Sequence, residues 1–334
     1  MAKLVLHIGT HKTATTTIQD CFARNADLLA THGLIYPRLN PASGHHGMVM
    51  DWVGLPLNYA IEGGSLAAMQ GLAQRYGAQE GTVLLSSEEF SRAASGGRVD
   101  FAALRQAAAG FSRIEVVCLL REQWQFLQSV YLEISRYSQS PPPAQWVAGL
   151  LATDMAQGLW ADYTRLYADL LQVFAADEIR FFSYADWAAA PEGVVGRMLA
   201  YLGVDLAVAD LEMDHGGRSN VSAPPLASWA ANVIAHPMAA AQGLVAACAG
   251  ALMVEYGEDR PSLLWQRDEM ARLLDYGAAR NAALTRAVIP HQPDFALPPC
   301  LPPANAVYRE DINSSFWCRA ARWIHRDALA RGVA

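Results

Sequence analysis

A short stretch near the N-terminus combines small residues, hydroxyl groups and one lysine, which together can bind an anion. Residues 9–17 read Gly-Thr-His-Lys-Thr-Ala-Thr-Thr-Thr, after an apolar run at residues 4–6 and before apolar residues at roughly helical spacing. A strand, a small-residue turn and a helix in this order direct backbone N–H groups toward one anion, and the helix dipole favours negative charge there. Lys12 adds a full positive charge, so the stretch predicts a phosphate cradle. The alternative is an ordinary strand–helix unit whose threonines cap the helix.

A second pair of candidate anion-binding side chains lies far along the chain. Residues 113–120 predict a strand, and the run at 116–120 is continuously apolar, as in a central parallel strand covered on both faces. Arg121 follows directly, and Ser129 lies further on, in a stretch that reads as a helix. An arginine fork and a serine hydroxyl can bind one phosphate. Taken alone, an arginine ion pair and an ordinary helix serine are the simpler interpretation.

Two glutamates follow a second buried-strand candidate. Residues 81–87 are bounded by glycine and end in two serines, after which come Glu88 and Glu89. Ligands of open α/β sheets bind at the carboxyl ends of the strands, so a carboxylate there is well placed to act as a base. The alternative is that Ser87 and the two glutamates begin the next helix, with the acids favoured by its dipole.

Two adjacent histidines, His45 and His46, are the remaining candidates for a base. They lie in a loop at residues 38–47 that is rich in proline, glycine, serine and asparagine. They could bind substrate, accept a proton or be solvent-exposed loop residues, and we favour the last interpretation slightly. Placement at a strand end makes Glu88 the first candidate for a base and Glu89 the second.

The two anion-binding stretches together resemble those of PAPS-dependent sulfotransferases, in the bacterial branch of that family. The family holds the 5′-phosphosulfate in a loop with a lysine, a threonine, a small residue and more threonines. It holds the 3′-phosphate through a strand-final arginine and a later serine, spaced as Arg121 and Ser129 are here, often with a tyrosine two residues on, as at Tyr131. The cofactor-binding residues that the resemblance implies are His11, Lys12, Thr13, Ala14, Thr15, Thr16, Arg121 and Ser129.

The resemblance also implies a reaction, which is the transfer of a sulfonate group from PAPS to a hydroxyl or amine, with PAP as the product. The acceptor would be a carbohydrate or glycan, a lipid or a small metabolite. Lys12 would stabilise the leaving group, and a glutamate or histidine would be the general base. Arg218, in a glycine-rich loop at residues 215–222, would close over the nucleotide, unless that loop is an ordinary surface loop.

Two other functions are compatible with parts of the sequence. One is a P-loop-like kinase of a small molecule. Its usual loop, G-x-x-x-x-G-K-[ST], is absent, because Lys12 follows Gly9 too closely and the second glycine is missing. The other is a non-catalytic PAP-binding module, supported by Ala14, which stands where the family usually has glycine. An alanine there must adopt a right-handed conformation or carry strain.

The composition indicates a folded protein that meets charged ligands through local groups. Of the 334 residues, 52% are hydrophobic and 17% charged, and the formal net charge of −7 argues against nucleic-acid binding. The five cysteines are odd in number and form no C-x-x-C pair, so we expect free thiols and neither a disulfide framework nor a zinc site. We expect no metal and a cytoplasmic protein. Residues 238–254 read as a buried or interfacial helix more readily than as a membrane span.

The elements that must position these residues predict an α/β fold. Strand candidates alternate with helices, which favours a P-loop-like three-layer αβα architecture with a central, mostly parallel sheet and additional C-terminal helices. We expect an α/β core at residues 1–225 and a mainly helical extension at residues 226–334. A helix is predicted at residues 160–174. An amphipathic tail at residues 313–330 would pack on the body or on a partner, for which a second copy of the chain is one candidate.

Overall fold

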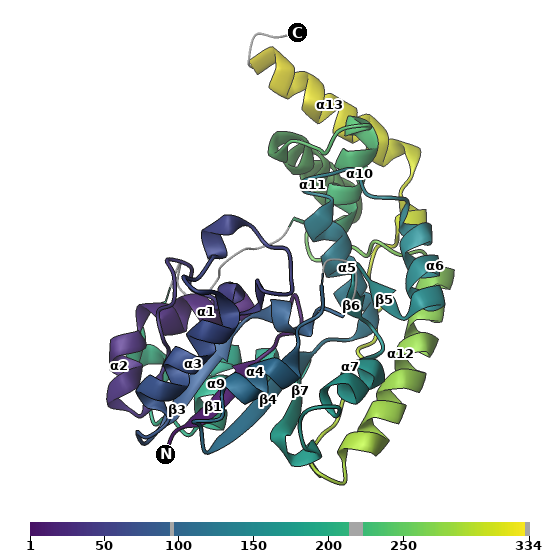
Figure 1. Cartoon of the computed structure of the whole chain (residues 1–334). Coiled ribbons are helices and arrows are strands. Elements are labelled where there is room, and N and C mark those ends of the chain that lie inside the picture. Colours follow the sequence, from purple (N-terminus) through teal and green to yellow (C-terminus); the bar gives the residue numbers. More distant parts are fainter. Residues whose placement is uncertain (94–96, 214–222, 331–334) are drawn as a thin grey trace. The chain divides into compact units, whose positions relative to one another are not determined.

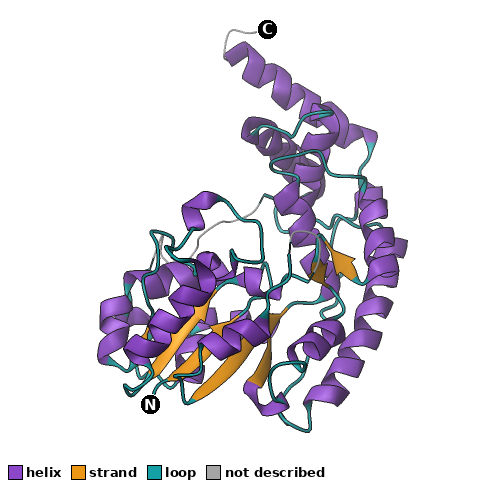
Figure 2. Ribbon diagram, in the orientation of Figure 1, coloured by secondary structure: helices purple, strands orange, loops and turns teal. Residues whose placement is uncertain are grey.

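The strands predicted around the candidate site form one parallel sheet in the computed structural model, which describes residues 1–93, 97–213 and 223–330. Each neighbouring pair of strands is parallel. Their order across the sheet is β2 (Leu34–Ile35), β3 (Thr82–Ser86), β1 (Lys3–His7), β4 (Arg113–Leu120) and β7 (Ile179–Ser183). Figure 2 shows these strands in orange with helices on both sides. Burial on both faces explains why the central strands are almost continuously apolar.

The chain divides into two compact units, each assembled from three stretches. The first unit contains Met1–Arg121, Gln157–Ser219 and Ala279–Pro298. The second contains Glu122–Ala156, Asn220–Ala278 and Pro299–Ala334. We expected residues 122–156 in the N-terminal core, but they cluster with the later helices. Side-chain bonds to main-chain carbonyls, such as those from Asn232 to Ser135 and from Trp265 to Trp124, link them there.

Helices cover both faces of the sheet in the first unit and give the expected three-layer architecture (Figure 1). One sheet face, with Val5 and Val117, packs against α1, α2, α8 and α9. The other, with Leu6 and Val116, packs against α3, α4, α7 and the end of α12. The bounds are α1 (Thr15–Arg24), α2 (Ala26–Thr31), α3 (Gly64–Tyr76), α4 (Phe101–Ala107), α7 (Tyr163–Leu170), α8 (Tyr184–Ala189), α9 (Gly193–Leu202) and α12 (Arg267–Val288).

The helix predicted at residues 160–174 is shorter than the apolar periodicity indicated. It is α7, and Trp160 belongs instead to the short strand β6 (Leu159–Trp160). The side chain of Asp162 accepts a hydrogen bond from the backbone N–H of Thr164 at 3.0 Å and so caps the start of the helix. A capping aspartate inside an apolar pattern therefore sets the boundary that the pattern alone misses.

The second unit is mainly helical over its described residues. It contains α5 (Gln123–Ile134), α6 (Pro143–Thr153), α10 (Pro225–Ala235), α11 (Gln242–Tyr256), α13 (Ser314–Ala330), the first part of α12 and the short strand β5 (Met155–Ala156). Phe316 and Ala320 of the amphipathic tail are buried in a cluster with side chains of α10 and α11. Over the described ranges, no helix combines the length and the apolar character needed to span a bilayer.

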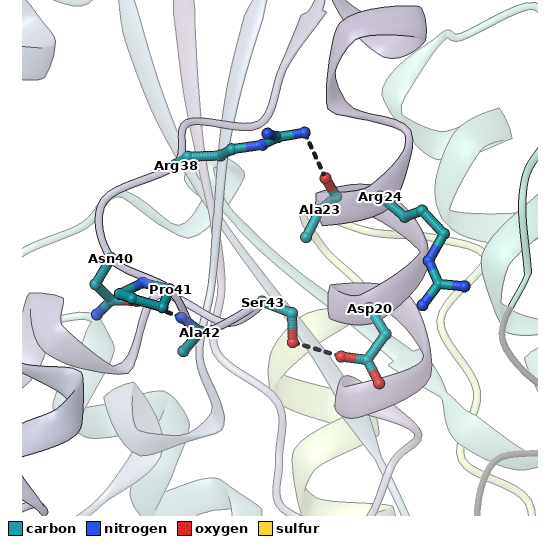
Figure 3. A pocket seen from close by; sticks show the side chains of 8 residues that line it. All are labelled: Asp20, Ala23, Arg24, Arg38, Asn40, Pro41, Ala42 and Ser43. Atoms are coloured by element: carbon teal, nitrogen blue, oxygen red, sulfur yellow. Dashed lines mark hydrogen bonds between the residues drawn. The ribbon is translucent and has the colours of Figure 1, made fainter.

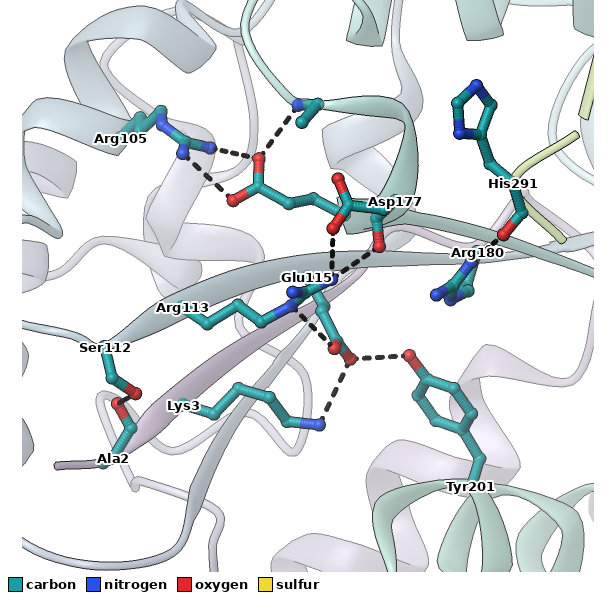
Figure 4. Close-up of polar contacts among 12 residues, drawn as sticks. Ala2, Lys3, Arg105, Ser112, Arg113, Glu115, Asp177, Arg180, Tyr201 and His291 are labelled. Carbon is teal, nitrogen blue, oxygen red and sulfur yellow. Dashed lines mark hydrogen bonds and ion pairs between the residues drawn. The ribbon is translucent and has the colours of Figure 1, made fainter.

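Ion pairs join the amino ends of the strands, a region that we call the amino edge (Lys3, Arg113, Glu115, Asp177 and Tyr201; Figure 4). The carboxylate of Glu115 accepts hydrogen bonds from Lys3 Nζ at 3.2 Å, Arg113 Nε at 3.1 Å and the Tyr201 hydroxyl at 2.8 Å. Arg113 also binds the carboxylate of Asp177 at 3.1 Å. Charges and hydroxyl groups at this end of the sheet thus satisfy one another.

Candidate functional site

Strand ends bring several of the predicted residues to one side of the sheet. In the pairing register, His7 at the end of β1 lies opposite Ser86 of β3 and Val117 of β4. The loop at residues 8–14, the segment at residues 87–91 and Arg121 all follow these strands. We call this region, with His7 and Ser86, the carboxyl edge. In open parallel sheets this is the side on which ligands bind.

Backbone contacts hold the loop that follows β1. The N–H of Thr10 donates to the carbonyl of Leu119 at 2.8 Å, and the hydroxyl of Thr13 donates to the carbonyl of Thr10. The angle φ is positive at Lys12 (65°) and at Ala14 (60°), with Thr13 between them outside this region. Backbone conformations that alternate in this way turn successive N–H groups into one anion-binding concavity. These conformations are compatible with the predicted cradle, which stays a prediction.

The first turn of α1 adds further N–H groups at the same place. Ile18 donates its N–H to the carbonyl of Ala14 at 3.2 Å, which closes the first helical turn. The N–H groups of Thr15 and Thr16 precede this bond, in the turn whose donors have no acceptor within the helix. Because the hydroxyl of Thr13 is used inside the loop, Thr13 shapes the cradle and could reach an anion through its N–H group.

The sequence left two conformations open for Ala14, a right-handed one and a strained left-handed one, and the structure shows the strained one. Ala14 is the N-cap residue of α1 and lies in the left-handed region, with φ 60° and ψ 27°. This conformation costs a residue with a Cβ atom roughly 1–2 kcal/mol. Backbone strain of this kind is concentrated at ligand-binding sites. The cradle thus keeps a shape that glycine would adopt freely, at some cost in stability.

Arg121 links the end of β4 to the loop. Its backbone carbonyl accepts a hydrogen bond from the Tyr163 hydroxyl at 2.6 Å. Its Nη1 donates to the carbonyl of Lys12 at 2.9 Å, and its guanidinium carbon lies 5.3 Å from the centroid of the Tyr184 ring. The guanidinium is half-buried and held on two sides, so the two predicted anion-binding stretches are in direct contact through Arg121 and Lys12.

Two further predicted contacts to the nucleotide stay predictions. Ser129 lies on α5, which belongs to the second unit. Arg218 lies outside the described residues. Their assignment to the 3′-phosphate and to a closing loop rests on the family resemblance alone.

Glu88 lies directly beside the cradle. A Cβ atom built on Gly9, whose φ is +89°, would be 2.9 Å from the Cβ of Glu88, so this close approach requires glycine. The side-chain amide of Gln19 donates to Glu88 Oε2 at 3.1 Å. Burial alone would raise the pKa of Glu88, but the nearby rings of His11 and His46 and the Gln19 amide lower it overall. Glu88 is therefore a carboxylate at neutral pH, held in place next to the loop.

Glu89 is engaged in contacts that make it a poor base. Its carboxylate forms an ion pair with Arg92 and lies 3.3 Å from His11 Nε2. Burial would raise the pKa of Glu89, yet the bonds from His11 and Arg92 lower it to about 2. The side chain of His11, predicted at the cofactor, is directed to this carboxylate. The alternative prediction for the segment also holds, because Ser87 caps a short 3-10 helix (Glu88–Ser91) by accepting from the N–H of Glu89.

The favoured interpretation of His45 and His46 as exposed loop residues is wrong. His45 is buried, with its Nε2 2.7 Å from the carbonyl of Pro37 and its Nδ1 2.9 Å from the N–H of Ser86. These partners make it a neutral ring that donates from Nε2, and burial lowers its pKa to about 4. His45 therefore has a structural role. His46 is half-buried, with Nδ1 2.9 Å from the Ser87 hydroxyl.

Three polar residues of the site were not singled out from the sequence. His7 Nδ1 lies 2.8 Å from the Ser86 hydroxyl, and Gln19 donates to the same hydroxyl at 3.3 Å. His7 is fully buried, its Nε2 has no hydrogen-bond partner among the described residues, and burial lowers its pKa to about 4. The sequence did contain a signal for two of these residues, because His7 and Ser86 are polar residues at the carboxyl ends of otherwise apolar strands, where ligands usually bind. Among the described residues, no group of three or more His, Cys, Asp or Glu residues could hold a metal ion.

Comparisons with known proteins find similarity to solved sulfotransferase structures. A sulfotransferase from Alicyclobacillus acidocaldarius has a TM-score of 0.47 and 14% sequence identity, over 85% of this chain and 94% of that one. The sulfotransferase domain of the Synechococcus PCC 7002 olefin synthase has a TM-score of 0.37 and 13% identity, over 82% of this chain and 94% of that one. No protein-family model and no curated protein matches the sequence.

Proposed function

We propose that this protein is a PAPS-dependent sulfotransferase, which moves a sulfonate group to a hydroxyl or amine of a carbohydrate, lipid or small-metabolite acceptor. The observation that carries the proposal is the contact between an anion cradle and a carboxylate. Gly9 of the cradle lies against Glu88, and Arg121 binds the carbonyl of Lys12. These contacts support the proposal because hydrogen-bond donors suited to a phosphate and a carboxylate suited to accept a proton lie next to each other at the carboxyl edge.

The donor would be held by the cradle and by Arg121. The backbone N–H groups of Ala14, Thr15 and Thr16 and the Lys12 ammonium would meet the 5′-phosphate. Arg121 would bind the 3′-phosphate, which ATP lacks. Arginine suits this role because its planar fork offers two parallel donors to phosphate oxygens.

In the transfer, the acceptor oxygen or nitrogen forms a bond to sulfur while the bond between sulfur and the 5′-phosphate oxygen breaks. The acceptor proton passes to the carboxylate of Glu88 as the new bond forms. Negative charge appears on the leaving phosphate oxygen, where Lys12 and the cradle N–H groups stabilise it. Gln19 holds the Glu88 carboxylate in position, and its side-chain amide also donates to the backbone carbonyl and the hydroxyl of Ser86.

Calorimetric titration and a transfer assay test the proposal. The purified protein is titrated with PAP, and with ATP plus Mg²⁺, and radiolabelled sulfate transfer from PAPS is measured over a panel of hydroxyl and amine acceptors. We expect PAP to bind, and we expect Lys12→Ala to lose about 100-fold or more in transfer rate at saturating PAPS, beyond any loss of PAP affinity. Binding of ATP–Mg²⁺ without PAP would overturn the proposal. PAP binding without transfer to any acceptor would indicate a non-catalytic module instead.

A further inference from the structure

A continuous chain of hydrogen bonds connects the interior of the sheet with Glu88. His7 Nδ1 lies 2.8 Å from the hydroxyl of Ser86, and the side-chain amide of Gln19 donates to this hydroxyl at 3.3 Å and to Glu88 Oε2 at 3.1 Å. His7 and Ser86 are fully buried and Gln19 is 2% exposed, whereas Glu88 keeps some exposure. The chain therefore ends at the one side chain of the series that solvent or a ligand can reach.

The direction of each hydrogen bond follows from the donors that are present. The two hydrogens of the Gln19 amide are both in use, one toward Ser86 and one toward Glu88. Because the Ser86 hydroxyl accepts from Gln19, its own hydrogen can donate to His7 Nδ1, and the proton of the neutral ring is then on Nε2. The other tautomer would leave both the Ser86 hydrogen and His7 Nε2 without a partner among the described residues. Burial lowers the pKa of His7 to about 4, so Nδ1 stays an acceptor at neutral pH.

The sheet itself holds the buried end of this chain. His7 and Ser86 are paired residues at the ends of β1 and β3. The N–H of Ser87 donates to the carbonyl of His7 at 3.0 Å, and the N–H of Ser86 donates to His45 Nδ1 at 2.9 Å. A site built on strand ends is held more precisely than one built on loops.

A loop confines the Gln19 amide from the other side. A Cβ atom at Gly44 would lie 2.6 Å from Gln19 Oε1, so a side chain there would displace the amide. Gly44 follows Ser43, whose hydroxyl donates to the carboxylate of Asp20, the residue after Gln19 on α1 (Figure 3). The amide is thus enclosed between this loop and the hydroxyl of Ser86.

We propose that His7 is a positioning residue of the transfer site, which acts through Ser86 and Gln19 to fix the direction of the Glu88 carboxylate. Glu88 Oε2 is bound to Gln19, and no described residue donates a hydrogen bond to Oε1, so Oε1 is the oxygen left to take the acceptor proton. The inference rests on the proposed function, because Glu88 is the base there. It adds that a fully buried histidine, three hydrogen bonds away, decides how this base is oriented.

The kinetics of two His7 variants test this role. His7→Leu removes the acceptor of the Ser86 hydroxyl, whereas His7→Asn keeps an acceptor atom near the place of Nδ1. We expect kcat of His7→Leu to fall by about 10-fold, with a Kd for PAP within about 2-fold of the wild type, because the base is no longer held in line. His7→Asn should recover most of this loss. Rates are divided by the concentration of PAP-binding sites, so unfolded protein does not contribute.

A double variant tests whether the effect passes through Gln19. If it does, His7→Leu should slow the Gln19→Met protein by less than about 2-fold, whereas independent effects would multiply. Asn25→Leu removes another buried amide, at the C-terminal end of α1, and is the control for lost stability. It should leave kcat unchanged.

The titration of Glu88 gives a readout that needs no transfer. Carbon-13 NMR of protein with labelled glutamate carboxyl groups follows this carboxylate, which is assigned by its absence from Glu88→Gln. The bond from Gln19 lowers the pKa of Glu88, so both His7→Leu and Ser86→Ala should raise it by loosening the amide. Ser86→Ala keeps the test available where His7→Leu does not fold.

The outcomes separate this inference from the proposed function. Wild-type values of kcat and of the Glu88 pKa in the His7→Leu and Ser86→Ala proteins, or multiplying effects in the double variant, overturn the positioning role and leave the sulfotransferase proposal standing. Equal losses in His7→Asn and His7→Leu overturn it too, because the acceptor atom is then not what this position supplies. A wild-type protein that does not bind PAP overturns the proposed function, and the positioning role falls with it.

Discussion

The two edges of the parallel sheet use the same kinds of side chain in opposite ways. At the amino edge, Glu115 binds Lys3, Arg113 and Tyr201, so each charge or hydroxyl group has a partner. At the carboxyl edge, His7 Nε2 and His11 Nδ1 are buried without a hydrogen-bond partner in the part of the chain that the structure describes. The backbone there also holds two residues that carry a Cβ atom, Lys12 and Ala14, at positive φ, whereas positive φ before the amino ends of β2 and β3 falls on glycines, Gly33 and Gly81.

This difference is the one expected between a region that stabilises the fold and a region that binds a ligand. Buried polar atoms are normally paired, so unpaired ones indicate a partner that arrives with the ligand or a cost carried for function. The strained backbone at Lys12 and Ala14 fits the same interpretation, since strain persists only where surrounding contacts enforce it. Substitutions at the two edges should therefore affect different properties, and the following comparisons test this.

The largest effect is expected from removing the proposed base. Glu88→Gln keeps the shape of the side chain and its contact with Gln19 but cannot accept a proton, so we expect transfer to fall by about 10²–10⁴-fold. PAP affinity should change little. Glu115→Gln at the amino edge is the control, and it should lower the free energy of unfolding and spare the transfer rate. Retention of full activity by the Glu88 variant would remove Glu88 from the mechanism.

Acid should weaken the carboxyl edge first. Burial holds the pKa of His7 and of His45 at about 4, below the ordinary value of 6.5. The unfolded chain therefore binds protons between about pH 6.5 and 4 that the folded chain does not, and stability falls as the pH drops through this window. Over this window, each histidine lowers the free energy of unfolding by on the order of 3 kcal/mol. The amino edge should weaken only below pH 4.5, because the pKa of Glu115 lies below that value.

Urea unfolding at pH 7, 5.5 and 4.5 measures this dependence. His7→Gln should reduce the loss of stability between pH 7 and 4.5, whereas His32→Gln, which removes an exposed histidine, should not. An unchanged pH dependence in the His7 variant would show that this ring is not held neutral by burial.

A smaller effect is expected at the arginine that joins the strand end to the cradle. Arg121→Gln removes the charged guanidinium, and we expect the Kd for PAP to rise by about 10- to 100-fold. This is the loss of affinity that corresponds to one hydrogen bond to a charged group. Arg113→Gln at the amino edge removes an arginine of the same sheet and should leave the Kd unchanged. Calorimetry with PAP measures both, and equal affinities for the wild type and the Arg121 variant would contradict the assigned role.

The smallest effect concerns Ala14. Ala14→Gly should relieve the left-handed strain, and after the entropy cost of glycine we expect the protein to be more stable by about 0.5–1 kcal/mol. Ala30→Gly, at an exposed position in α2, should instead destabilise it by about 1 kcal/mol. Denaturant titration compares the two. A destabilising Ala14→Gly would show that the cradle does not store strain at this residue.

The sheet was predictable from the sequence because buried parallel strands are apolar runs that end abruptly, as at residues 116–120. The division into two units was not, because the pairing of α5 with later helices depends on contacts between residues distant in the chain. The burial of His45 was missed for the same reason, since its partners Pro37 and Ser86 come from a loop and a separate strand. The roles of Lys12, Glu88 and Ser129 remain predictions, to be decided by the measurements above.

The contact between Gly9 and Glu88 restricts how the two segments can change in sequence. A Cβ atom at position 9 would lie 2.9 Å from the Cβ and 3.1 Å from the Cα of Glu88, so the distance between the loop after β1 and the start of the Glu88 side chain does not depend on any rotamer. Position 9 should therefore stay glycine while its neighbours vary, because any larger residue there would push the two segments apart.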